Sequence, residues 1–156
     1  MKATVITASN RAAAGVYEDT GGPLIVEALT GLGFEVTGPI VVLDGQPVGD
    51  AIAAAIADGA RAVLTTGGTG LTPTDLTPQA TRPFFEREVP GIAEAIRAYG
   101  AAKGVPTAAL SRGLAGISGR TLIINLPGSR GGVKDGLAVV TPLLTHAVEQ
   151  IAGSDH

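Results

Sequence analysis

The sequence predicts a single-domain α/β fold with a doubly wound, mostly parallel sheet and helices on both of its faces. Short β-branched runs alternate along the chain with stretches that carry apolar residues at helical spacing. This alternation is typical of right-handed βαβ crossovers, which build parallel sheets. The length of 156 residues fits one domain of ordinary size, and a hydrophobic content of 45% supplies one apolar core. We therefore expect one domain over residues 1–156.

The first half of the chain predicts three strands and two helices. Residues 2–8 (KATVITA) are rich in β-branched side chains and predict a strand. Residues 23–32 place apolar side chains at helical spacing, with a proline near the start and a glycine just after the end. Residues 34–43 contain a second strand, residues 48–57 predict a helix rich in Ala and Ile, and residues 61–66 predict a third strand. The third strand is continuously apolar, as expected when helices cover both faces of the sheet.

The second half predicts two further helices, one strand and a long final helical region. Thr77 is a favourable N-cap because Pro78 follows it at the first helical position. The later elements are a helix over residues 90–103, a short apolar segment over 107–110, a strand over 120–126 and a helical region over 133–151. A kink is expected in that last region at Pro142, because proline removes a helical hydrogen bond.

Polar or glycine-rich loops follow all four predicted strands. In doubly wound sheets, ligands bind outside the carboxyl ends of the strands, and these ends share one edge. The loops are Ser9-Asn10-Arg11, Asp44-Gly45, Gly67 to Asp75, and Pro127 to Arg130. We expect them to form the ligand site together.

Composition excludes several kinds of site. The chain has no Cys and only two His, which leaves neither thiolate chemistry nor a histidine cluster for zinc. A net charge of −3 and 3% aromatic residues disfavour nucleic-acid binding. The apolar runs are too short or too interrupted to predict a membrane span or a signal peptide. We therefore expect a cytoplasmic protein, without nucleic acid or membrane as partner, whose chemistry uses carboxylates, backbone amides and a hard metal.

The segment TTGGTG at residues 65–70 is the strongest candidate for a phosphate-binding loop. Its three glycines let the backbone approach a ligand closely, and successive N–H groups can form an anion-binding concavity. The spacing matches neither the dinucleotide fingerprint nor the P-loop. A tight strand-to-loop turn is the structural alternative.

Two acidic residues on the predicted ligand edge suggest a magnesium site. Asp75 lies five residues after Gly70, and Asp44 follows the second strand. A carboxylate beside an anion-binding loop is reasonable when Mg²⁺ bridges it to the phosphates, and Mg²⁺ commonly takes one or two protein carboxylates. Each Asp could instead stabilise a local turn. Ser111, Arg112 and Ser129 add hydrogen-bond donors suited to phosphate. No protein nucleophile is evident, so direct transfer between bound substrates is the natural mechanism.

Four segments together resemble the molybdopterin adenylyltransferase family of molybdenum cofactor biosynthesis. They are SNRAAAGVYEDTGG (9–22), TTGGTGLTPTDLTPQAT (65–81), SRGLAGISGRTLIINLPGS (111–129) and HAVEQI (146–151). The resemblance spans nearly the whole chain. It implies an α/β nucleotidyltransferase, usually a homotrimer, that binds molybdopterin and Mg²⁺-ATP. Such an enzyme transfers AMP to the terminal phosphate of the pterin and releases pyrophosphate, and a molybdate-insertion enzyme of the same pathway is its expected partner.

The resemblance also assigns roles to residues. Asp75 and Asp44 match acids that the family uses near the metal and phosphates, and we expect both to be catalytic and to bind Mg²⁺. The Gly67–Gly70 loop would hold phosphate or pterin groups, and the loop 127–129 would seat the nucleotide. The expected substrate- and nucleotide-binding residues are Ser9, Gly67, Gly68, Thr69, Gly70, Ser111, Arg112, Pro127, Gly128 and Ser129.

Three positions depart from the family pattern. Asn10 stands where many members have Asp, Leu43 replaces a common Pro, and Gln79 replaces the usual Glu. The first and third changes remove acids near the expected site. They keep open a second hypothesis, a non-catalytic scaffold that binds and delivers molybdopterin. A generic nucleotide hydrolase is a third.

Overall fold

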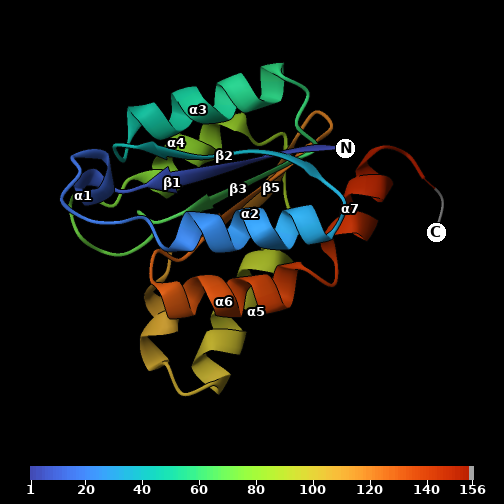
Figure 1. Ribbon diagram of the computed structural model, residues 1–156. Helices are drawn as coiled ribbons and strands as arrows, with labels where there is room; N and C mark the ends of the chain where they lie inside the picture. The colour runs from blue at the N-terminus through green and yellow to red at the C-terminus, as the bar shows by residue number, and fades with distance from the viewer. Residues whose placement is uncertain (155–156) are drawn as a thin grey trace.

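The computed structural model describes residues 1–154 and has a six-stranded sheet at its centre (Figure 1). The strand order is β2-β1-β3-β6-β5-β4. The strands are β1 (Lys2–Ala8), β2 (Glu35–Val42), β3 (Ala62–Thr66), β4 (Arg87–Glu88), β5 (Ala115–Ser118) and β6 (Thr121–Leu126). Neighbouring strands from β2 to β6 are parallel, whereas β5 runs antiparallel to both β6 and β4. The carboxyl ends of the four parallel strands therefore lie at one edge.

Helices cover both faces of the sheet. Over the described residues they are α1 (Asn10–Ala13), α2 (Gly21–Gly31), α3 (Gln46–Ala57), α4 (Thr77–Thr81), α5 (Pro90–Ala102), α6 (Arg130–Val140) and α7 (Leu144–Ile151), with 3₁₀ turns η1 (Arg82–Phe84) and η2 (Pro106–Leu110). Figure 1 shows α3 and α4 on one face and α2, α5 and α6 on the other. This arrangement is the doubly wound, mostly parallel fold that the sequence predicts.

Alternate residues of the central strands build two cores. Val5, Leu64 and Ile124 point to the face of α2, α5 and α6, and all three are fully buried. Their chain neighbours Ile6 and Val63 point to the opposite face, under α3. Because both faces are buried, the strands read as continuous apolar runs rather than as alternating ones.

Most predicted elements are confirmed, three features differ in detail, and two strands are additional. The polar loop expected after β1 contains the short helix α1, whose N-cap Ser9 accepts a hydrogen bond from the Ala12 amide at 3.1 Å. Thr77 is the first residue of α4 and not its N-cap, because Leu76 occupies that position. The expected kink at Pro142 is a break between α6 and α7. Strands β4 and β5 were not predicted.

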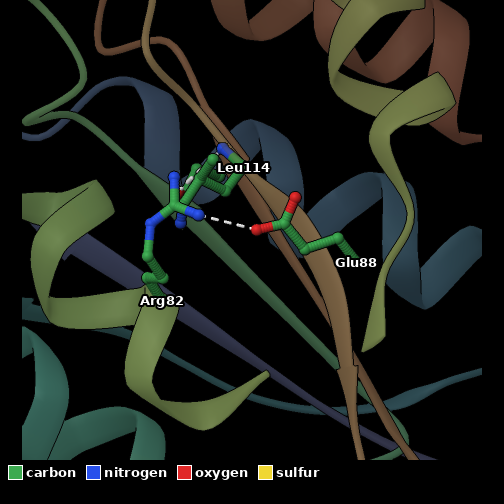
Figure 2. A network of polar contacts seen from close by, with 4 residues as sticks. Arg82, Glu88 and Leu114 are labelled. Carbon is green, nitrogen blue, oxygen red and sulfur yellow. Dashed lines mark hydrogen bonds and ion pairs between the residues drawn. The ribbon is translucent and has the colours of Figure 1, made fainter. Parts of the chain in front are cut away.

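The unpredicted strands are short and lie at the edge of the sheet. In β4 both residues are exposed, so no apolar alternation marks it in the sequence. Arg82 of η1 forms an ion pair with Glu88 of β4 at 2.6 Å, and Leu114, just before β5, is drawn beside them (Figure 2). Both charged side chains are about half exposed, so this pair contributes little to stability. The pair links η1 to the edge strand β4.

None of the helices within residues 1–154 is long and apolar enough to cross a membrane. The longest, α5, has 13 residues. A membrane-spanning helix needs about 20 apolar residues.

Candidate functional site

A cavity of about 390 Å³ opens at the carboxyl edge of the sheet, where the expected ligand loops meet. Eight residues predicted from the sequence line it: Gly68, Thr69, Gly70, Asp75, Ser111, Pro127, Gly128 and Ser129. A smaller adjoining cavity of about 130 Å³ is lined by Ser9 and Gly67, and it shares Gly128 with the larger one. The loops after β1, β3 and β6 therefore meet as expected.

The glycine loop has a backbone that other residues could not adopt without strain. Gly67 and Gly68 have φ values of +92° and +68°. A Cβ on Gly68 would collide with the Asp44 carboxylate and with the Thr77 hydroxyl. Gly128 approaches so closely that its own Cβ would lie 3.0 Å from the Cα of Gly67. These glycines therefore allow close contact between two loops. The Gly67 amide donates to the Leu126 carbonyl at 3.2 Å, so the amides that can face a ligand begin at Gly68.

Asp75 lies in the loop and reaches the large cavity. Its Oδ2 accepts hydrogen bonds from the Thr72 amide at 3.0 Å and from the Thr72 hydroxyl at 2.8 Å. Its Oδ1 accepts none from residues 1–154. The carboxylate therefore stabilises its own turn with one oxygen and does not cap α4. The other oxygen is available to a ligand or a metal ion.

Asp44 has a different environment. Its Oδ1 accepts hydrogen bonds from the Gly45 amide and the Thr77 hydroxyl, each at 2.8 Å, and its Oδ2 accepts one from the Leu76 amide at 3.0 Å. It lines neither cavity described above. Its carboxylate ties the loop after β2 to the start of α4 and so fixes the end of the Asp75 loop. These contacts favour a positioning role.

Asn10 holds the other side of Asp44. Its Oδ1 accepts a hydrogen bond from the Asp44 amide at 3.1 Å. An Asp at this position would offer the same acceptor, so the amide side chain preserves the contact. The substitution noted in the sequence therefore leaves the anchoring of Asp44 intact.

Arg112 braces the Asp75 loop from behind. Its Nε donates to the Gly70 carbonyl at 2.9 Å and its Nη2 to the Asp75 carbonyl at 2.7 Å. Its amide donates to the Thr69 carbonyl at 2.8 Å. Arg112 does not line the large cavity. Its side chain therefore positions the loop, which differs from the phosphate contact that the sequence suggested.

Gln79 accepts the remaining Arg112 contact, from Nη1 to Oε1 at 3.3 Å. The side chain lies at the back of the loop and does not line the cavity. We expect Gln79→Glu to raise the free energy of unfolding by about 0.3–1 kcal/mol, because the neutral acceptor becomes a charged one at an exposed site. Urea unfolding measures the change, with Gln79→Ala as the matched loss of the contact. If Gln79→Glu were less stable than the wild-type protein, the contact between Arg112 and residue 79 would not stabilise the loop.

A buried polar cluster supports both loops from beneath. Asn125 of β6 donates to the hydroxyls of Thr65 at 2.8 Å and Thr81 at 3.1 Å, and its Oδ1 accepts from the Leu114 amide at 3.1 Å. Thr81 in turn donates to the Thr77 carbonyl at 2.7 Å. Since every buried polar side-chain atom described here has a partner, the cluster holds α4 rigidly on the sheet.

Two helices complete the large cavity in a way that the sequence did not reveal. The first turn of α6 contributes Gly131 and Gly132, and its N-cap Ser129 accepts a hydrogen bond from the Gly132 amide at 3.0 Å. Arg97 of α5 donates to the carbonyls of Ser111 and Gly113 at 3.3 and 3.1 Å. The remaining lining residues that were not predicted are Ile96, Gly100, Val105, Thr107, Ala108, Leu110 and Asp135. A glycine pair just after the start of a helix is the one signal that could have indicated part of this wall.

Two carboxylates among the described residues line the large cavity, those of Asp75 and Asp135. Residues 1–154 contain no cluster of three or more His, Cys, Asp or Glu side chains that could hold an ion. A structural zinc site or an all-protein calcium site is therefore absent from the described chain. The free Oδ1 of Asp75 fits Mg²⁺, which takes one or two carboxylates and completes its shell with phosphates and water.

Comparison with known proteins finds relatives over nearly the whole chain. Residues 4–146 match a family model described as a probable molybdopterin binding domain. The chain belongs to this family. Among curated family relatives, a molybdenum cofactor biosynthesis bifunctional protein of Synechococcus elongatus is 43% identical over 99% of this chain and 48% of that protein. A molybdopterin adenylyltransferase of Helicobacter pylori is 37% identical over 96% of this chain and 87% of that enzyme.

A solved structure supports the fold directly. The molybdopterin biosynthesis Mog protein of Mycobacterium ulcerans superposes with a TM-score of 0.91 at 49% identity, covering 96% of this chain and 98% of that one. This family member confirms the α/β fold and the resemblance carried by the sequence motifs. The chain spans about half the length of the first curated relatives that it matches, 48% and 50%.

Proposed function

We propose that the chain is a molybdopterin adenylyltransferase, one molybdopterin- and nucleotide-binding domain over residues 1–156. It would transfer AMP from Mg²⁺-ATP to the terminal phosphate of molybdopterin and release pyrophosphate. The observation that carries the proposal is Asp75, which lines a cavity walled by the glycine loop and the first turn of α6 and whose Oδ1 accepts no hydrogen bond from residues 1–154. Similarity to the Helicobacter pylori molybdopterin adenylyltransferase over 96% of this chain supports it.

Backbone amides would form the phosphate-binding site. The first amides of α6 have no intrahelical partner, and the helix dipole adds positive potential there. Gly131 and Gly132 line the cavity together with Gly68 and Gly70. The Gly132 amide already donates to the Ser129 hydroxyl at 3.0 Å, so the Gly131 amide is the one that this turn offers to a ligand. Phosphates therefore meet N–H donors from two elements and need few cationic side chains.

Asp75 is the residue that would hold Mg²⁺ beside those phosphates. The metal, when bound, would neutralise negative charge as pyrophosphate leaves. Thr72 and Arg112 fix the carboxylate and its loop in place. Asp44 as a second ligand stays a prediction, and its three protein donors favour a role in positioning.

The reaction needs no protein nucleophile. A terminal phosphate oxygen of molybdopterin forms a bond to the α-phosphorus of ATP, and the bond from that phosphorus to the bridging oxygen breaks. The electron pair leaves with pyrophosphate. The chain contributes by holding both substrates in line and by directing amides at the transferring phosphate.

One assay separates the three hypotheses. The purified protein is incubated with molybdopterin, ATP and Mg²⁺, and the products are resolved by chromatography. Adenylylated molybdopterin together with pyrophosphate supports the transferase. Pterin binding without product would favour the scaffold, and loss of ATP without pterin would favour a hydrolase.

Assembly and location follow from the family resemblance. We propose a cytoplasmic homotrimer that passes its product to a molybdate-insertion enzyme. Leu43 and Leu76, 51% and 39% exposed, flank the end of β2 and offer apolar contact area for a second copy. Sedimentation equilibrium measures the oligomeric state, and a monomer at micromolar concentration would overturn that part of the proposal.

A further inference from the structure

Asp135 is an acidic residue in the cavity that the proposed mechanism does not use. It lies on α6, one turn beyond the glycines of the first turn, and its side chain is only 18% exposed. Within residues 1–154 its one partner is Lys103 of α5, with the Lys103 ammonium 3.7 Å from Asp135 Oδ1. It accepts no hydrogen bond from that part of the chain. Partly buried carboxylate oxygens are normally hydrogen-bonded, so Asp135 has capacity for donors from a ligand.

The position of Asp135 restricts which part of a ligand it can meet. Gly131 and Asp135 are four residues apart and therefore share one face of α6, roughly 6 Å apart along its axis. The amides near Gly131 favour phosphate, whereas a carboxylate repels it. A ligand that places its phosphate at the helix start must therefore present hydrogen-bond donors one turn further along.

The two proposed substrates carry different groups next to their phosphates. In ATP the ribose follows the phosphates, and its adjacent 2′- and 3′-hydroxyls are hydrogen-bond donors. In molybdopterin the atoms nearest the phosphate include the dithiolene sulfurs, which are not O–H or N–H donors. The ribose therefore fits Asp135 better than the pterin does.

The remaining wall of the cavity suits a flat heterocycle. Apolar contacts come from Ile96 of α5, Val105 just before η2, and Leu110 of η2. A base extending past the ribose would lie against them. The cavity thus combines amides, a carboxylate and an apolar wall, groups that suit a phosphate, a ribose and a base.

We propose that Asp135 accepts hydrogen bonds from the ribose hydroxyls of the nucleotide and selects ribonucleotides over deoxyribonucleotides. This inference rests on the proposed function, because it takes ATP as the substrate. Lys103, whose side chain is 56% exposed, forms an ion pair with Oδ1 of Asp135. The other oxygen is left for the ligand.

The test compares ATP with 2′-deoxyATP and 3′-deoxyATP. Calorimetry measures the dissociation constant of each nucleotide with Mg²⁺, and the pterin assay measures kcat/KM. We expect the wild-type protein to favour ATP by about 10- to 100-fold over at least one deoxynucleotide, the range of one hydrogen bond to a charged acceptor. In Asp135→Asn the preference should fall to about threefold or less, while the KM for molybdopterin stays unchanged.

Lys103→Met is the matched control. It removes the ion-pair partner and keeps the carboxylate, so the preference for ATP should persist. If Asp135 served only to pair with Lys103, both variants would behave alike, which would overturn the inference. Equal binding of ATP and both deoxynucleotides by the wild-type protein would also overturn it and requires no variant to fold. Absence of adenylylated pterin with ATP would instead count against the proposed function, and the binding constants would still decide the role of Asp135.

Discussion

Asp75→Asn is expected to abolish most AMP transfer while leaving the fold intact. The amide oxygen of Asn can still accept from the two Thr72 donors, so the turn survives. An NH₂ group then takes the position of the free Oδ1, and the side chain loses its negative charge. Losing one preorganised electrostatic group at a phosphoryl-transfer site costs about 10²- to 10³-fold in kcat. The adenylylation assay measures kcat, and molybdopterin binding should change little.

Asp50→Asn is the matched control for this change. Asp50 is an exposed residue of α3 that pairs only with Gln46 in the described chain, at 2.8 Å, and does not line the cavity. Its amide variant should retain full turnover. Unchanged turnover of Asp75→Asn, at the same Mg²⁺ concentration as the wild type, would remove Asp75 from the mechanism.

The fold could be predicted because its signals are local and periodic. β1 and α5 follow from β-branched runs and from helical spacing after a proline, and their observed bounds agree closely with the prediction. β4 has two exposed residues, and its pairing with β5 depends on a partner nearly thirty positions away. Tertiary pairing of that kind leaves no periodic signal in a short segment.

The site could be predicted where backbone chemistry determines the residue type. Gly68 must be glycine because its φ is positive and no space exists for a Cβ, so the loop is visible in the sequence. The roles of Arg112 and Asp135 are set by which helix faces the cavity, a property of packing. Arg112 braces the loop, and Asp135 carried no signal at all, because an acid on an amphipathic helix is usually solvated.

Asp44→Asn is expected to lower both stability and turnover, and the comparison with Thr77→Val decides why. Asp44 accepts three hydrogen bonds, and an amide can satisfy only the donors at one oxygen, leaving its NH₂ group facing the Leu76 amide. The lost hydrogen bond to a charged group costs about 1.5–3 kcal/mol of unfolding free energy. The Asp75 loop then moves, and kcat should fall at least about tenfold, since small displacements of reacting groups are costly.

Thr77→Val removes one donor to Asp44 and preserves the charge of the carboxylate. Thr77 is fully buried, so the valine fits the space but leaves Asp44 less firmly held. If Asp44 acts by positioning the loop, both variants lower kcat and neither changes the Mg²⁺ concentration that gives half-maximal rate. If Asp44 ligates the metal, Asp44→Asn alone raises that concentration. Titration of Mg²⁺ against rate for the two variants therefore assigns the role, and the hydrogen bonds to Gly45, Leu76 and Thr77 favour the first outcome.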